Sequence, residues 1–417
     1  MRKNTPHLTK SCEAPPWRLV WQLAWGQLLV WGVLYYAFTA LAAPIHADTG
    51  WSRSLINGGL SVGLLTWGIL ALPVGMWIQR RGVKGVMTLG CLIGGISFSA
   101  LGYVTDPWHF YLAWACMGAA MAALLYEPAF AAVTMAFGSL YKRGIVLITL
   151  VAGFASTAFI PFTYLLADHY GWRNACKGLG AAVVAIGIPL HCLNLPQSVS
   201  RPREDSDKLQ KTIGHAIRTF KTDFTNRTFL LLALWFTAHT AAFSGLIFLI
   251  VPTMTSMGAD PASLLVAMAL IGPMQVLGRL LVASRSGKFS SIEVGRWAMI
   301  AMTLSVLILI ALPPSFAWLL CFAVLFGTGN GLMTILKGTA IAEYFGTLRY
   351  AELNGALATP SMISKAAAPF LLSAIWENSA TPTYVFVTLF FVLLIGLGAV
   401  LNLPNPDPEI DVVPSTH

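Results

Sequence analysis

The sequence predicts an all-α polytopic membrane protein. Of its 417 residues, 56% are hydrophobic and only 10% are charged, whereas soluble domains carry about 25% charged residues. Apolar runs long enough to cross about 30 Å of hydrocarbon as a helix occur twelve times along the chain. Several short motifs also recur at one offset in the two halves. Together these observations predict twelve transmembrane helices in two pseudo-symmetric six-helix bundles.

The predicted spans form two groups of six, separated by one long polar segment. The first group comprises residues 17–43, 52–78, 85–104, 108–137, 144–167 and 172–195. The second group comprises residues 228–256, 261–284, 293–312, 316–345, 352–376 and 381–403. The corresponding domains are an N-terminal tail (1–16), an N-terminal bundle (17–195), a central loop (196–227), a C-terminal bundle (228–403) and a C-terminal tail (404–417).

The central loop contains a candidate surface helix at residues 209–220. Leu209, Ile213, Ile217 and Phe220 recur at i, i+4, i+8 and i+11, the spacing of one face of a helix. This amphipathic pattern is typical of a helix that lies on a membrane surface or against a bundle.

The two halves resemble duplicated copies. An offset of 208 residues relates four features: the LNLP motifs at 193–196 and 401–404, Pro44 and Pro252, Phe137-Gly138 and Phe345-Gly346, and Pro161 and Pro369. Four matches at a single offset indicate two repeats. Repeats of this kind place a transported substrate at their interface, near the middle of the membrane.

Lysine and arginine predict the orientation. Of 26 such residues, only Arg53, Arg173 and Lys177 fall on the loops of one side, and most of the others fall on the opposite side. The positive-inside rule therefore predicts both termini and the central loop in the cytosol, with the protein in the cell inner or plasma membrane. The net charge of +9 follows from this topology and does not indicate nucleic-acid binding. Residues 1–16 lack the apolar core of a cleavable signal peptide.

The loop after the second span carries a recognisable motif, because residues 75–84 read GMWIQRRGVK. Together with the twelve-span repeat and the basic central loop, this segment resembles the major facilitator superfamily, whose signature is G-x-L-x-D-R-x-G-x-[RK]. The likeness extends over nearly the whole chain. It implies a cytoplasmic gating loop formed by Gly75, Gln79, Arg80, Gly82 and Lys84, with Gln79 in place of the acid of the family.

A finer resemblance is to the monocarboxylate and oxalate/formate branch. The GWSR segment at 50–53 resembles the start of the second span in bacterial members, and GPMQVLGR at 272–279 looks like the D-x-x-x-R pair of the branch. The resemblance implies that Arg279 binds an anion and that Gln275 replaces the aspartate. The first-span lysine of the branch has no counterpart near Thr39, so we expect Lys337 to supply that charge. The G-x-x-x-G-P motif of antiporters is absent from the fifth span, which disfavours a drug/proton antiporter.

Charged side chains within spans are the main site candidates, because a charge at that depth is costly unless it faces a partner or a wet cavity. The planar fork of Arg279 suits a carboxylate; snorkelling to the interface is the alternative. Lys337 lies in the glycine-rich tenth span, with an interfacial lysine as its alternative. Glu127, before Pro128, is expected to pair with Lys337 across the halves as a charge gate or to carry a coupling proton. A structural ion pair within one half is the alternative.

His239 is a second candidate proton carrier, because imidazole titrates near neutral pH, although a lone histidine on an apolar helix is more often packed against a neighbour. Lys365, four residues before Pro369, is interpreted as a packing or gating residue, with a place in the site lining as the alternative. The neutral candidates for substrate binding are Tyr35, Tyr36, Asn57, Gln275 and Asn330, although such side chains also make interhelical hydrogen bonds.

These residues predict a secondary transporter of a small, monocarboxylate-like organic anion that works by alternating access with proton symport. The alternative is an exporter of an organic or drug-like compound. The sequence contains 14 Trp and 23 Phe residues, which would line an apolar cavity suited to such a compound. The sequence contains no HExxH, GxSxG or P-loop motif, so we expect no enzyme activity. We also expect no cofactor or metal, and a monomer in the lipid bilayer with a small anionic substrate as its partner.

Overall fold

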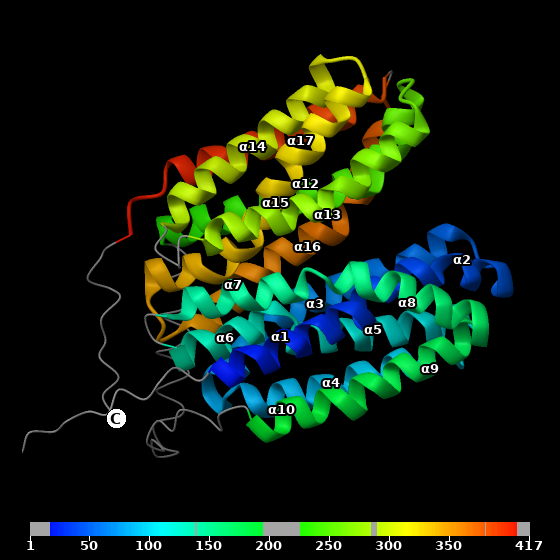
Figure 1. Ribbon diagram of the computed structural model, residues 1–417, viewed down its shortest axis with the longest axis vertical. Helices are drawn as coiled ribbons and strands as arrows, with labels where there is room; N and C mark the ends of the chain where they lie inside the picture. Colours follow the sequence, from blue (N-terminus) through cyan, green and yellow to red (C-terminus); the bar gives the residue numbers. More distant parts are fainter. Residues whose placement is uncertain (1–16, 138–139, 195–225, 285–289, 380, 407–417) are drawn as a thin grey trace, which may run out of the picture.

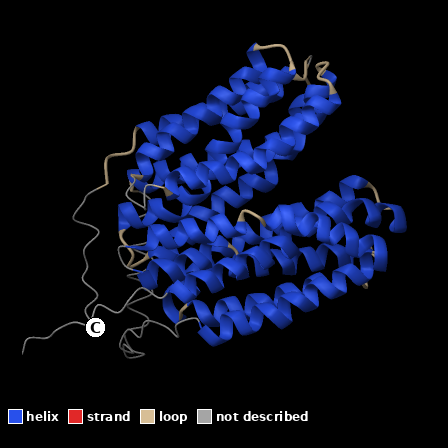
Figure 2. Cartoon of the chain, viewed as in Figure 1, coloured by secondary structure: helices blue, strands red, loops and turns tan. Residues whose placement is uncertain are grey.

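The computed structural model is a bundle of long helices (Figures 1 and 2). It describes residues 17–137, 140–194, 226–284, 290–379 and 381–406, and this part of the chain contains no strand. The predicted all-α fold is therefore confirmed. The surface helix predicted at 209–220, the N-terminal tail and most of the C-terminal tail lie outside the described residues.

Several spans of the N-terminal half are interrupted helices. The first span consists of α1 (Trp17–Trp31), η1 (Gly32–Tyr36) and α2 (Ala37–Thr49), and the second is α3 (Arg53–Arg81). The third is α4 (Val83–Leu101), and the fourth consists of α5 (Pro107–Leu124) and α6 (Tyr126–Phe137). The fifth consists of α7 (Tyr141–Ala152) and α8 (Ala155–Tyr170), and the sixth of α9 (Trp172–Ala182), η3 (Val183–Gly187) and α10 (Ile188–Asn194).

The spans of the C-terminal half are single long helices. They are α12 (Arg227–Ser256), α13 (Pro261–Ala283), α14 (Ser291–Ala311), α15 (Phe316–Phe345), α16 (Tyr350–Glu377) and α17 (Thr383–Leu401). Within the described residues, 11 helical segments are long and apolar enough to cross a membrane. The twelfth long helix, α16, is not among these segments; it carries the polar residues Asn354, Ser361, Ser364 and Lys365.

The ends of the first span in each half show the duplication in the backbone. Gly50 follows α2 with φ 68°, and Gly258, 208 residues later, follows α12 with φ 90°. This left-handed conformation favours glycine because it has no Cβ. Pro44 and Pro252 lie inside the two helices at equivalent positions.

The two halves form two lobes that touch at one end and diverge at the other (Figure 1). At the touching end, α3 packs directly against α16. A Cβ added at Gly75 would collide with the carbonyl oxygen of Ala351, and one added at Gly355 would meet that of Ala71. Small residues allow two helices to approach this closely in a membrane, so these two glycines seal this end, which we call the closed end.

The interruption in the first span changes which side chains it presents. The N–H of Ala37 donates to the carbonyl of Gly32, five residues earlier, which makes η1 a short π-helical segment. The ring of Phe159 packs where a side chain at Gly32 would lie. Segments of this kind occur frequently at functional sites, and this one carries Tyr35 and Tyr36.

Candidate functional site

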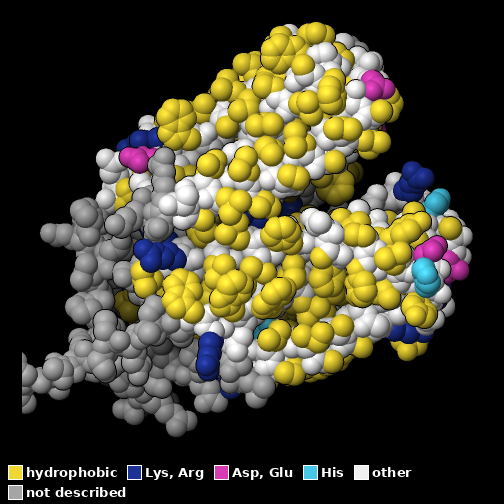
Figure 3. Space-filling model, in the orientation of Figure 1, with side chains coloured by type: hydrophobic (Ala, Val, Ile, Leu, Met, Phe, Trp, Pro, Cys, Tyr) yellow, Lys and Arg dark blue, Asp and Glu magenta, His cyan; other side chains and the backbone are white. Residues whose placement is uncertain are grey.

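A cavity of about 1010 Å³ lies between the two halves. Its walls come from both halves, namely from the first, second, fourth and fifth spans and from α12, α13, α15 and α16. The hollow between the lobes widens away from the closed end, toward the right in Figure 3. Cavities of this size accommodate small organic ligands.

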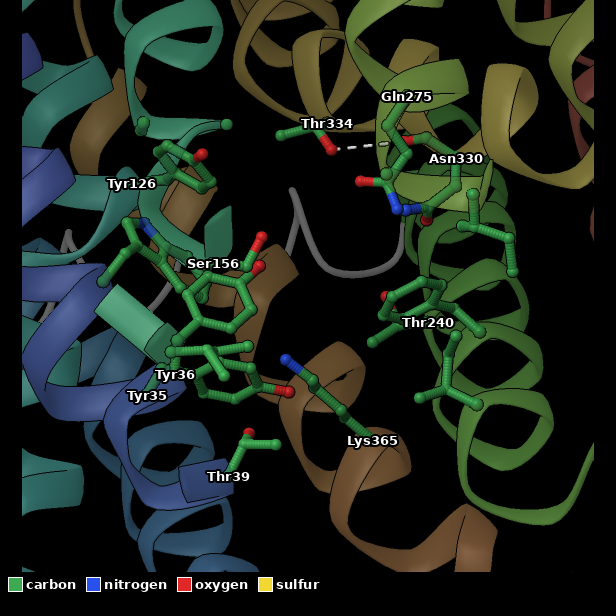
Figure 4. A pocket seen from close by; sticks show the side chains of 18 of the residues that line it. Tyr35, Tyr36, Thr39, Tyr126, Ser156, Thr240, Gln275, Asn330, Thr334 and Lys365 are labelled. Atoms are coloured by element: carbon green, nitrogen blue, oxygen red, sulfur yellow. Dashed lines mark hydrogen bonds between the residues drawn. The ribbon is translucent and has the colours of Figure 1, made fainter. Parts of the chain in front are cut away.

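The cavity collects most of the residues singled out by sequence. All the predicted binding and proton-coupling side chains are among its lining residues: Tyr35, Tyr36, Asn57, Glu127, His239, Gln275, Arg279, Asn330 and Lys337. Figure 4 shows Tyr35, Tyr36 and Tyr126 on one side of the open space and Gln275, Asn330 and Thr334 on the other. The roles of these residues in substrate binding stay predictions.

Glu127 and Lys337 form an ion pair that connects the two halves. Lys337 Nζ on α15 lies 2.8 Å from Glu127 Oε1 on α6. The helical hydrogen bonding changes at Leu125, where ψ is −153°, and α6 restarts with Glu127 and Pro128 in its first turn. The second carboxylate oxygen of Glu127, Oε2, is buried and has no hydrogen-bond partner among the described residues. The predicted pairing across the halves is therefore present.

Arg279 also reaches across the halves, from α13 to the end of α7. Its side chain is buried, with 5% of the residue exposed, and Nη1 donates to the carbonyl of Thr149 at 2.8 Å. A Cβ at Gly153 would collide with this nitrogen, so the glycine makes room for the guanidinium. The C-terminal end of α7 carries partial negative charge, which favours a cation there. The alternative of snorkelling to the interface is excluded by this burial.

Lys365 lies in the cavity wall, which was the alternative to the packing or gating role that its sequence position favoured. Its ammonium lies 4.3 Å from the ring centre of Tyr35, 5.8 Å from that of Trp67 and 6.0 Å from that of Trp31. These distances are typical of cation–π contacts. Among the described residues, no carboxylate pairs with Lys365. A buried cation without an anionic partner is the feature expected of an anion-binding site.

His239 and Asn330 form a polar pair on the wall of the C-terminal half. His239 Nε2 and Asn330 Oδ1 are 3.0 Å apart, a contact in which the imidazole donates when Nε2 carries its hydrogen. The backbone carbonyl of Asn330 accepts a hydrogen bond from the hydroxyl of Thr334 at 3.2 Å. His239 is therefore both held by a neighbour, as is usual for a buried histidine, and placed at the cavity.

The residues of the predicted gating loop lie at the closed end, outside the cavity. Gly75 makes the close approach to α16 described above, and Gly82 ends α3 with φ 82°. Gln79 replaces the acid of the family, and its Nε2 donates to the carbonyl of Leu348 in the other half at 2.6 Å. Arg80 is exposed and Lys84 is partly buried. A gating role for these five residues stays a prediction.

A second ion pair joins the halves at the closed end, and sequence reasoning missed it. Lys142 Nζ on α7 lies 2.7 Å from Glu343 Oε1 on α15. Glu343 also accepts from the backbone N–H of Ser291 at 3.1 Å and from its hydroxyl, at the start of α14. In the sequence Lys142 is a basic residue in a loop and Glu343 lies close to a span end, where a charge by itself does not indicate a partner.

The geometry is that of a two-lobed helical bundle with a central cavity, and the comparisons with known proteins agree. The sequence-family model of the Major Facilitator Superfamily matches residues 23–369. The chain belongs to this superfamily. Its members are transporters, so the protein is a multi-pass membrane transporter and not an enzyme.

Relatives with curated names are distant. An uncharacterized MFS-type transporter of Bacillus subtilis, YcxA, is 24% identical over 375 residues, which cover 87% of this chain and 88% of the relative. Monocarboxylate transporter 12 of Xenopus laevis is 23% identical over 421 residues, which cover 92% and 87%, respectively. A region of 127 residues, 30% of this chain and 27% of the relative, is 28% identical to human monocarboxylate transporter 11.

Solved structures share the fold over most of the chain. The human organic anion transporter MFSD10 superposes with a TM-score of 0.71 at 14% identity, covering 93% of this chain and 100% of that structure. FucP in the outward conformation superposes with a TM-score of 0.72 at 10% identity, covering 93% and 98%. The proton:xylose symporter XylE gives 0.72 at 13% identity, covering 93% and 96%.

Proposed function

We propose that this transporter carries a small organic anion of the carboxylate class by alternating access, coupled to proton symport. The observation that carries the proposal is Lys365, a buried cavity cation that faces aromatic rings and pairs with no carboxylate of the described residues. A substrate carboxylate would supply the missing partner. The name of the Xenopus relative, a monocarboxylate transporter, supports the same class.

The other two cavity cations have different tasks in this proposal. Lys337 is held by Glu127 and Arg279 by the carbonyl of Thr149, and both contacts join the halves. A bound anion close to either cation competes with these contacts. Substrate binding would therefore loosen the connection between the halves, which is the step that alternating access requires.

The closed end carries the basic loops, so the positive-inside rule places it in the cytosol. On this orientation the cavity faces outward and is poised to receive external substrate. Proton symport follows from Glu127: protonation removes its charge, frees Lys337 for the anion and weakens the connection between the halves. His239 is the second candidate carrier, but its ring is already held by Asn330.

The proposal is tested by uptake into proteoliposomes with an acidic exterior. A panel of labelled carboxylates, a lipophilic cation and a neutral hexose separates the proposed class from an exporter of drug-like compounds and from a sugar carrier. Saturable uptake of at least one carboxylate, stimulated by the pH gradient, is expected. Transport of the cation or hexose with no carboxylate uptake would contradict the proposal.

Lys365→Met is the decisive variant. Loss of one charge-assisted hydrogen bond costs about 1.5–3 kcal/mol, which corresponds to an apparent affinity about 10- to 150-fold weaker. Lys365→Arg should retain part of the binding. Lys177→Met is the matched control, because Lys177 also lies over a ring, 4.1 Å from that of Tyr103, but outside the cavity. Equal carboxylate uptake by the Lys365→Met and Lys177→Met variants would remove Lys365 from the site.

A further inference from the structure

We infer that the substrate is an aromatic carboxylate, whose ring lies on an aromatic strip of the N-terminal half while its carboxylate meets Lys365. The inference rests on the proposed function and specifies the substrate class. The aromatic strip consists of Tyr35, Trp31, Tyr126 and Phe130, all of which line the cavity.

The aromatic strip is continuous and begins at the free cation. The ring of Tyr35 lies under Lys365 and meets Trp31 at 5.4 Å between ring centres. Trp31 meets Tyr126 at 4.9 Å, and Tyr126 stacks on Phe130 at 5.1 Å with an interplanar angle of 9°. Such separations are those of interacting aromatic rings.

The far end of the aromatic strip lies against α15, the helix that carries Lys337. The ring of Phe130 packs against Gly338 of α15, next to Lys337 in the chain. The strip therefore extends from Lys365 toward Lys337. Trp31 and Phe130 are buried, at 8% and 1% exposed, and they support the strip from behind. A planar anion anchored at Lys365 would therefore contact mainly the partly exposed rings of Tyr35 and Tyr126.

The opposite wall presents rings at the equivalent positions of the repeat. The offset of 208 residues relates Trp31 to His239 and Tyr35 to Phe243. The His239 and Phe243 rings are 6.5 Å apart and nearly parallel, with an interplanar angle of 19°, and both residues line the cavity. Each half thus offers a ring pair, four residues apart on its first helix, on which a flat guest can rest.

The size of the cavity favours the same class. A two-carbon acid such as acetate would occupy a small part of about 1010 Å³ and leave the aromatic strip in contact with water. An acid with a ring removes more apolar surface from water, and its π-face matches the faces of the strip. Among carboxylates, those with an aromatic ring use most of this wall.

Three acids test whether the site selects an aromatic ring, any ring of similar size, or only the carboxylate. Benzoate, cyclohexanecarboxylate and acetate are compared as inhibitors of carboxylate uptake, in wild-type protein and in the Tyr126→Leu and Tyr384→Leu variants. Tyr384 is an exposed tyrosine of α17 outside the cavity, which makes it the control. We expect benzoate to bind about tenfold more tightly than cyclohexanecarboxylate, and Tyr126→Leu to remove most of this preference while Tyr384→Leu keeps it.

The outcomes distinguish the aromatic assignment from the proposed carboxylate transport. Equal inhibition by benzoate and cyclohexanecarboxylate, or an unchanged benzoate preference in Tyr126→Leu, would overturn the aromatic assignment while the carboxylate function stands. Absence of saturable uptake of every carboxylate would overturn the proposed function itself. If the Tyr126→Leu protein is missing from the membrane, the milder Tyr126→Phe and Trp31→Phe variants replace it. Both keep a ring and should preserve the preference for benzoate. Absence of this preference in both variants would also contradict the aromatic assignment.

Discussion

The ion pair between Glu127 and Lys337 gives the sharpest test of how the closed end is held. Replacing Glu127 with Gln leaves Lys337 mostly buried without its partner, since the two side chains are 10% and 18% exposed. The pair joins the halves. Its loss therefore destabilises the present conformation relative to a second conformation in which the closed end has opened. We expect the variant to shift the equilibrium toward that second conformation.

The magnitude follows from the geometry. At 2.8 Å and an effective dielectric constant of about 20, the Coulomb attraction is about 6 kcal/mol. Desolvation of both ions offsets most of this attraction, and coupling energies of neighbouring residues measured by double-mutant cycles reach about 3 kcal/mol. We therefore expect the free-energy difference between the two conformations to change by about 2 kcal/mol. This corresponds to an increase of about thirtyfold in the population in which the closed end is open.

The assay measures the labelling rate of a cysteine placed at Ile78, in protein whose six native cysteines are replaced by alanine. Ile78 is 2% exposed and lines a small void beside Glu127 at the closed end, so the thiol reacts only when this end opens. Labelling should accelerate about thirtyfold in Glu127→Gln, and the exchanged pair Glu127→Lys with Lys337→Glu should restore the slow rate.

The control is Asp48→Asn, which breaks a pair with Arg173 inside the N-terminal half and should leave labelling unchanged. The reasoning is refuted if Glu127→Gln labels at the wild-type rate. It is equally refuted if the effects of Glu127→Gln and Lys337→Gln simply add in the double variant, because independent effects mean that the two residues do not act as a pair.

Two further predictions concern the other contacts between the halves. Arg279→Gln should abolish saturable carboxylate uptake without loss of protein from the membrane, because it removes a cavity cation and its bond to Thr149; uptake kinetics that match the wild type would exclude Arg279 from the site. Glu343→Gln should accelerate labelling of the cysteine at Ile78 about tenfold by weakening the Lys142 pair, while carboxylate affinity stays unchanged because Glu343 lies outside the cavity wall. A constant labelling rate in Glu343→Gln would show that this pair does not hold the closed end.

Much of the fold could be predicted because membrane spans have a strong local signal. The tenth span predicted at 316–345 is α15, Phe316–Phe345. The first span ends six residues later than predicted, at Thr49, and the other spans agree within three residues. Proline and motif matches at a single offset also predicted the duplication, which the positive φ of Gly50 and Gly258 repeats in the backbone. The short interruptions were harder, because the π-helical segment η1 depends on how Phe159 packs against Gly32.

The site could be predicted in part, for a related reason. A charge inside an apolar span is visible in sequence, and Glu127, Arg279 and Lys337 were found this way. What a charge contacts is not visible: the partner of Arg279 is a backbone carbonyl, which has no side-chain signature. The Lys142–Glu343 pair joins residues at two span ends, where charges are common and their partners depend on tertiary packing.

Lys365 illustrates the same limit. Its aromatic neighbours come from the first and second spans, about 300 residues away in the sequence, and no spacing rule connects them. The sequence shows a lysine near a proline inside a span, which favours packing or gating and leaves a place in the site lining as the alternative. The importance of Lys365 became visible when the two halves were placed in space.

The central claim is that Lys365 holds an anionic substrate in the cavity between the halves. The most direct measurement is equilibrium binding of the radiolabelled carboxylate with the highest flux to purified wild-type, Lys365→Met and Lys177→Met protein. Saturable binding to the wild type and the Lys177 variant, weakened at least tenfold in Lys365→Met, is the predicted result. Equal affinity of all three proteins would contradict the account.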